Sequence, residues 1–157
     1  MRKELKETYA TLEECKADIL GMYNNVFMVE KGVFPESFEK ETYVTFLAGV
    51  FRSVRFGINE AHGGGNAIIY NYLLERGGYE YNSETQKVKV NFDKVGSELR
   101  NLANIILMIQ AKGNYQGAKD LIAKYAINSP SMQILRDKLA SLPVDIKPIY
   151  EIEKMYK

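Results

Sequence analysis

Apolar residues recur every three or four positions along most of the chain, which is the spacing of an amphipathic α-helix. Glycine and proline residues interrupt this spacing and separate one helix from the next, as the Gly77-Gly78 pair does. We expect helices at residues 12–29, 37–55, 60–76, 94–112, 115–125 and 130–141.

The segment 79–92 has a different pattern. Residues 79–81 and 87–90 alternate with period two around a polar stretch at 82–86, which predicts a β-hairpin. After residue 143 we expect an extended tail up to residue 148 and then a short charged helix. The sequence therefore predicts a mainly α fold: a single-domain, irregular helical bundle over residues 1–157, with one small β-hairpin at about 79–92.

Composition excludes several classes of function. Lys and Arg number 21 against 20 Asp and Glu, so charge gives no reason to expect nucleic acid or an anionic membrane as partner. No apolar run approaches the ~20 residues that span a bilayer, and the first residues lack the apolar segment of a signal peptide. The single cysteine fits a reducing compartment, so we expect the cytoplasm.

Metal chemistry is limited by the presence of one histidine, His62, and one cysteine, Cys15. A zinc site usually needs three or four N, S or O ligands. The chain cannot contain an HExxH helix or a cysteine-rich zinc module. Any metal site here would depend on carboxylates.

The densest group of carboxylates is Glu13, Glu14 and Asp18. On a helix, Glu14 and Asp18 share a face, whereas Glu13 lies about 100° away. Such a pair can supply a metal ligand and a second carboxylate that orients a ligating imidazole. A structural interpretation stays open, in which Thr11 is an N-cap and Glu14 closes a capping box.

His62 is followed by three glycines, residues 63–65, which allow another backbone or a ligand to approach closely. A lone histidine can equally be structural or solvated. The string HGGG occurs in the oxyanion loop of some lipases and esterases. The chain has no G-x-S-x-G elbow and no second histidine, so we reject that match.

Two strings in the right order resemble dipeptidyl peptidase III. Residues 13–18, EECKAD, resemble the second zinc motif of that family, and residues 60–62 with 68–77, EAH and IIYNYLLERG, resemble its conserved-histidine segment. Residues 51–57 with 62–65, and the closing segment 143–146, resemble the subgroup in which this domain follows a Nudix hydrolase domain. The resemblance covers nearly the whole chain.

The resemblance implies a role for each matching residue. Glu14 corresponds to a zinc ligand, Glu13 and Asp18 to acidic neighbours that support the metal ligands, and His62 to a catalytic histidine beside the substrate. The implied reaction is zinc-assisted attack of water on a peptide carbonyl near a free N-terminus, which releases dipeptides. Asn66 stands where the better-known enzymes tend to carry an arginine. No substrate-binding residue is assigned.

The family's first motif, His-Glu-x-x-Gly-His, supplies two zinc ligands and the general base, and this chain lacks it. The resemblance therefore implies a fragment of the zinc-bearing lobe of a larger protein, with zinc in the parent and none in this chain alone. Its partners would be the N-terminal part with the first motif and a Nudix domain, and a peptide substrate. Two alternatives stay open: a free-standing helical interaction module, and a non-catalytic regulatory domain attached to a Nudix hydrolase.

The implied mechanism makes geometric predictions. Glu14 and Asp18 should share a face that is not fully buried. His62 should face the same cleft as Glu14, with about 6–12 Å between the two functional groups if one substrate residue lies between them. Residues 63–65 should keep the cleft wall free of side chains.

Overall fold

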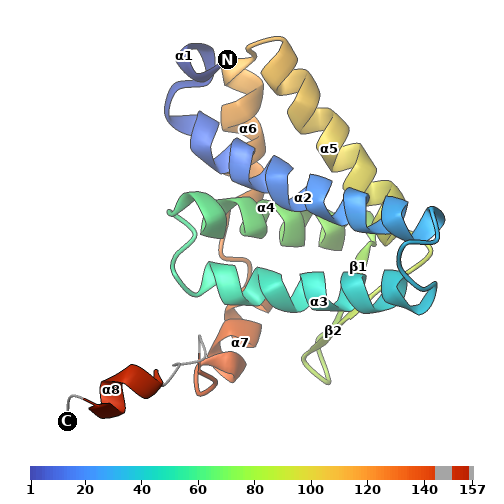
Figure 1. Ribbon diagram of the computed structural model, residues 1–157. Helices are drawn as coiled ribbons and strands as arrows, with labels where there is room; N and C mark the ends of the chain where they lie inside the picture. Colours follow the sequence, from blue (N-terminus) through green and yellow to red (C-terminus); the bar gives the residue numbers. More distant parts are fainter. Residues whose placement is uncertain (144–149, 156–157) are drawn as a thin grey trace.

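The computed structural model describes residues 1–143 and 150–155, and its architecture is mainly α-helical with one β-hairpin, as the sequence pattern predicted (Figure 1). The chain begins with α1 (Arg2–Leu5) and a short 3-10 helix, η1 (Lys6–Thr8). The remaining elements are α2 (Tyr9–Glu30), α3 (Ser37–Val54), α4 (Ala61–Arg76), β1 (Tyr79–Asn82), β2 (Lys87–Val90), α5 (Val95–Ala111), α6 (Tyr115–Tyr125), α7 (Pro130–Leu139) and α8 (Glu151–Met155).

Helix α2 begins earlier than expected. Its first residue is Tyr9, and Thr8 is the N-cap without a side-chain capping hydrogen bond. Thr11 lies within the helix, so its prediction as an N-cap was wrong, and Glu14 is not part of a capping box. The reason is tertiary: Leu5 and Thr8 are buried, so the preceding turn joins the core and continues into α2. Most of the tail expected to be extended lies outside the described residues.

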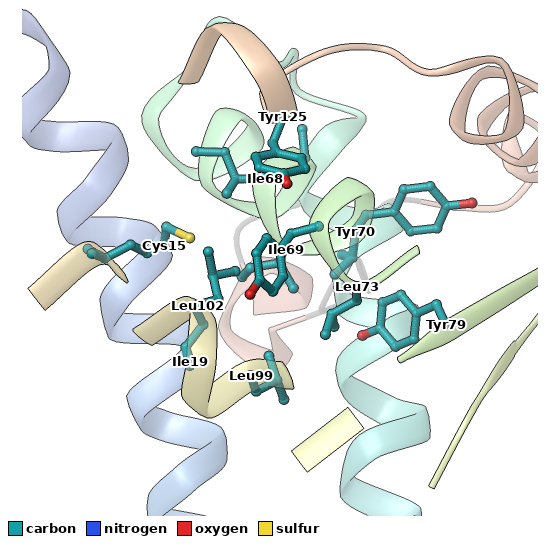
Figure 2. Packing of buried hydrophobic residues seen from close by; sticks show 14 of the residues in the cluster. Cys15, Ile19, Ile68, Ile69, Tyr70, Leu73, Tyr79, Leu99, Leu102 and Tyr125 are labelled. Carbon is teal, nitrogen blue, oxygen red and sulfur yellow. The ribbon is translucent and has the colours of Figure 1, made fainter. Parts of the chain in front are cut away.

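Helix α4 is the centre of the fold. Every residue from Gly63 to Leu73 is buried, because α2, α3, α5, α6 and β1 all pack around it. The apolar spacing predicted an amphipathic helix, but a helix that is covered on all sides needs no polar face. Figure 2 shows its residues Ile68, Ile69, Tyr70 and Leu73 among side chains from α2, α5, α6 and β1.

The end of α4 leads into the hairpin through a glycine cap. Gly77 adopts a left-handed conformation (φ 78°), and the Gly78 amide donates to the Leu73 carbonyl at 2.8 Å, which is a Schellman motif. Strands β1 and β2 then pair antiparallel, with Tyr79 opposite Val90. The buried Tyr79 ring attaches the hairpin to the core.

Helices α2 and α4 run in the same direction, with α3 running back between them in sequence (Figure 1). This arrangement brings the start of α4 beside the first half of α2, which carries Glu13, Glu14 and Asp18. Within the residues that the structure describes, no helix combines the length and apolar character needed to cross a membrane.

Candidate metal and substrate site between α2 and α4

The first turns of α4 approach α2 very closely because they carry no side chains. A Cβ atom added to Gly65 would lie 2.9 Å from the backbone nitrogen of Cys15, and one added to Gly64 would lie 3.1 Å from Cγ2 of Thr11. Gly63 fits against the loop before α4, where a Cβ would lie 1.9 Å from the carbonyl oxygen of Gly57. The glycines therefore set the distance between the two helices.

At this close approach His62 contacts Glu14. Nδ1 of His62, in the first turn of α4, lies 3.1 Å from Oε2 of Glu14 on α2. The imidazole side chain is 67% exposed and the Glu14 side chain 35% exposed, so the pair faces solvent. Even a charged pair this exposed would add little to stability, about 0–1 kcal/mol, so the contact does not itself hold the helices together.

One helical turn further along, Asn66 pairs with Asp18. The Asn66 amide donates to Oδ2 of Asp18 at 2.8 Å and also to the carbonyl of His62 at 3.0 Å. Asn66 is buried, and Asp18 is half-buried. Burial raises the pKa of the Asp18 carboxyl; the hydrogen bond from Asn66 and the nearby His62 oppose that shift, and Glu14 adds to it. The two pairs form a ladder along α2 and α4.

Glu13 faces another side of α2, as the 100° rotation per residue requires. Its Oε1 accepts hydrogen bonds from Lys16 at 2.7 Å and from Gln110 of α5 at 2.7 Å. Glu13 therefore joins α2 to α5, and any support that it gives to the site acts through this packing.

The geometric expectations are met in part. Glu14 and Asp18 share the face of α2 that meets α4, and neither side chain is fully buried. The expected 6–12 Å gap between Glu14 and His62 was wrong, because the two side chains are in direct contact at 3.1 Å. The glycines do not form a bare cleft wall; they are buried and face other backbones.

Among the residues that the structure describes, no three His, Cys, Asp or Glu side chains form a group that could hold a metal ion. Zinc sites usually need at least three such donors. The Glu14–His62 pair is thus at most part of a metal centre. Because His62 contacts Oε2 of Glu14, the other carboxylate oxygen, Oε1, is the one left for a metal ion.

Two residues of this region were not predicted as partners. Asn66 is four residues after His62, the same spacing as between Glu14 and Asp18, and this match is a signal for two helices that pair side by side. Gln110 is separated from Glu13 by 97 residues and has no comparable signal in the sequence.

Comparison with known proteins gives a consistent result, although no protein-family model matches the chain. The chain is 60% identical to the dipeptidyl peptidase III structure from Caldithrix abyssi, with a TM-score of 0.96, over 99% of this chain and 30% of that one. The dipeptidyl peptidase III structure from Corallococcus sp. strain EGB is 38% identical, with a TM-score of 0.89, over 98% of this chain and 28% of that one.

A curated relative is Nudix hydrolase 3 from Arabidopsis thaliana, which is 39% identical over 154 residues. The match covers 97% of this chain and 20% of the plant protein. The chain thus spans less than a third of each of these relatives. By sequence and by fold, it is similar over nearly its whole length to a part of dipeptidyl peptidase III and of a Nudix-named relative, as the two sequence motifs predicted.

Proposed function

We propose that this chain works as part of a larger zinc-dependent exopeptidase that resembles dipeptidyl peptidase III. In this proposal Glu14 is a zinc ligand and His62 is the histidine on the substrate side. The observation that carries the proposal is the contact between Nδ1 of His62 and Oε2 of Glu14, which joins the two motifs across 48 residues at 3.1 Å. The identity of 60% with a dipeptidyl peptidase III structure supports it.

Each residue of the ladder has a role that its contacts support. Nδ1 of His62 lies 3.1 Å from Oε2 of Glu14, which leaves Nε2 for a substrate atom. Asp18 accepts from Asn66 through Oδ2, so Oδ1 is left to orient an imidazole ligand supplied by the rest of the protein. Zinc, when bound, would polarise a peptide carbonyl and activate water.

The proposal requires the remaining zinc ligands and the general base to come from a His-Glu-x-x-Gly-His motif outside this chain. One carboxylate is a weak ligand, since zinc affinity comes from several donors in fixed geometry. We therefore expect this chain alone to retain less than one zinc per molecule after dialysis. One tightly held zinc per isolated chain would contradict the division of ligands proposed here.

The decisive experiment uses the full-length protein from the parent open reading frame. We expect one zinc per molecule by elemental analysis, and release of dipeptides from the N-terminus of peptides followed by mass spectrometry. Glu14→Gln should lower both the zinc content and the rate of dipeptide release. Glu41→Gln, which changes an exposed carboxylate on α3, should change neither. A parent protein that lacks the first motif, or that releases no dipeptides while fully loaded with zinc, would argue against peptidase activity.

A second function is favoured by the plant relative, whose name is Nudix hydrolase 3. In this alternative the chain is a non-catalytic helical domain that regulates an attached Nudix hydrolase. It predicts a parent without the His-Glu-x-x-Gly-His motif, no bound zinc, and a Nudix activity that changes when residues 1–157 are deleted. The Glu14→Gln variant would then leave all measured activities unchanged.

A further inference from the structure

A second surface feature lies between α2 and α5. A groove of about 490 Å³ runs between these helices, from Ile19 to Glu30 on α2 and from Gly96 to Leu107 on α5. Twelve residues of helix span about 18 Å at 1.5 Å per residue, so the groove is about three helical turns long. Its floor is formed by buried side chains that include Ile19 and Leu99.

The walls of the groove are apolar and exposed. Tyr23, Phe27 and Leu107 line it and are 52%, 43% and 44% exposed. A contiguous apolar surface of this kind marks a binding surface, whereas single exposed apolar residues do not.

The groove is remote from the proposed zinc site. Tyr23 is nine residues after Glu14 on α2, and nine residues at 100° each place the two on opposite sides of the helix. A ligand in the groove would therefore not contact Glu14 or His62. The groove is also long and open along two helices, a shape that fits a helix better than a small molecule.

Charged residues at the groove fit a polypeptide partner. Arg100 and Glu30 line the groove together with Asn101 and Asn104, so both signs of charge are present. In the part of the chain that the structure describes, neither Arg100 nor Glu30 forms a salt bridge. An acidic side chain opposite Arg100 and a basic one opposite Glu30 would fix the direction of a bound helix.

We propose that the groove between α2 and α5 binds an amphipathic helix from another part of the same, longer polypeptide. This chain is 60% identical to a dipeptidyl peptidase III structure and covers 30% of it. The other 70% of that relative is more than twice as long as the matched part. The helix would place apolar residues at i, i+3 or i+4, and i+7 over Tyr23, Phe27 and Leu107. The inference rests on the part of the proposed function that puts the chain in a larger protein, and not on zinc or peptide hydrolysis.

The test compares this chain with the full-length parent protein, both freed of metal. Leu107→Cys puts an accessible thiol in the groove, while the native Cys15 is buried. We expect a maleimide to label Cys at position 107 rapidly in this chain and at least roughly tenfold more slowly in the parent. Equal rates in the two proteins, or an open reading frame that encodes these 157 residues alone, would overturn the proposal.

A binding experiment identifies the occupant. With the rest of the parent polypeptide supplied as a separate chain, Tyr23→Glu and Leu107→Glu should each weaken its binding to this chain, measured by calorimetry. Val44→Glu is the matched control, since Val44 is 52% exposed on α3 and does not line the groove. It should leave binding unchanged. A chain that forms dimers alone, and becomes monomeric with Leu107→Glu, would show that a second copy occupies the groove and would overturn the proposal.

The outcomes separate this inference from the proposed peptidase. A parent protein that protects position 107 but binds no zinc supports the groove proposal and contradicts the zinc site. A parent that binds zinc and leaves position 107 unprotected supports the zinc site and contradicts the groove proposal.

Discussion

Asn66 makes two side-chain hydrogen bonds at the candidate site. Its amide reaches both the Asp18 carboxylate on α2 and the carbonyl of His62 on its own helix. Because Asn66 is buried, neither contact can be replaced fully by water. The side chain therefore fixes the position of α4 along the axis of α2. This also sets the position of His62 relative to Glu14.

Asn66→Ala should lower the free energy of unfolding by about 1–3 kcal/mol, because a half-buried carboxylate loses its donor. Asn101→Ala is the matched control: Asn101 also donates to an acidic side chain from within a helix, but this hydrogen bond is exposed. It should change stability by less than about 0.5 kcal/mol. Urea denaturation measures both. The position of His62 can be followed separately by NMR, since the chain has one histidine. Equal stability of the two variants would contradict the role given to Asn66.

Gly65→Ala tests whether close approach of the helices forms the site. The added Cβ would lie 2.9 Å from the Cys15 nitrogen, so α2 and α4 must separate, at a cost of roughly 1–3 kcal/mol. Gly49→Ala on α3 meets nothing within 4 Å and should instead stabilise the protein by about 0.5–1 kcal/mol. Opposite signs in thermal denaturation are the expected result. A stabilising Gly65→Ala would mean that a Cβ atom fits between α2 and α4 without separating them.

At the scale of elements, the sharp end of α4 matters most. The helix stops at Gly77, the chain turns, and the hairpin folds back so that Tyr79 enters the core. The Schellman hydrogen bond from Gly78 to Leu73 satisfies a helix-end carbonyl and fixes the direction in which the chain leaves.

Gly77→Ala forces an L-residue into the left-handed conformation at φ 78°. We expect a loss of roughly 1–2 kcal/mol in the free energy of unfolding. Nothing tight surrounds this position, since the nearest atom to an added Cβ is Nζ of Lys94 at 3.4 Å. The loss would therefore come from the backbone alone, and Gly77→Asn should recover part of it, because Asn tolerates this conformation better. Equal destabilisation by both substitutions would contradict this explanation.

At the scale of the whole molecule, α4 joins the long helices and the hairpin into one core. Its buried residues contact α2, α3, α5, α6 and β1, and the Asn71 amide donates to the carbonyls of Tyr125 and Ile127 after α6. Elements that share one central helix cannot separate without exposing it. We therefore expect cooperative unfolding.

Cys15 provides a direct measurement of this cooperativity. Its side chain is buried beside α4, and burial raises the pKa of the thiol, so the reactive thiolate is disfavoured in the folded protein. Ellman's reagent should react with Cys15 only as the protein unfolds, at the same guanidinium concentration at which helical circular dichroism is lost. Labelling that precedes the loss of helix would indicate that α2 detaches from α4 separately.

The sequence by itself determined the local structure and which residues are candidates for the site. Apolar periodicity predicted the helices and the hairpin because period 3.6 and period two are properties of neighbouring residues. The spacing of Glu14 and Asp18 was enough to put them on one face, and the glycine pair was enough to end α4. The resemblance to dipeptidyl peptidase III came from two short motifs, at residues 13–18 and at 60–62 with 68–77. It agrees with the comparisons.

Only the tertiary structure decided how these pieces meet. The hydrogen bond from Asn66 to Asp18 joins residues 48 apart, and its existence depends on the packing of three helices and the loops between them. The glycines after His62 proved to serve helix packing, because the backbone of α2 occupies the space that their side chains would fill. Periodicity defines which face of each helix is apolar, but it carries no information on which other helix covers that face or how closely.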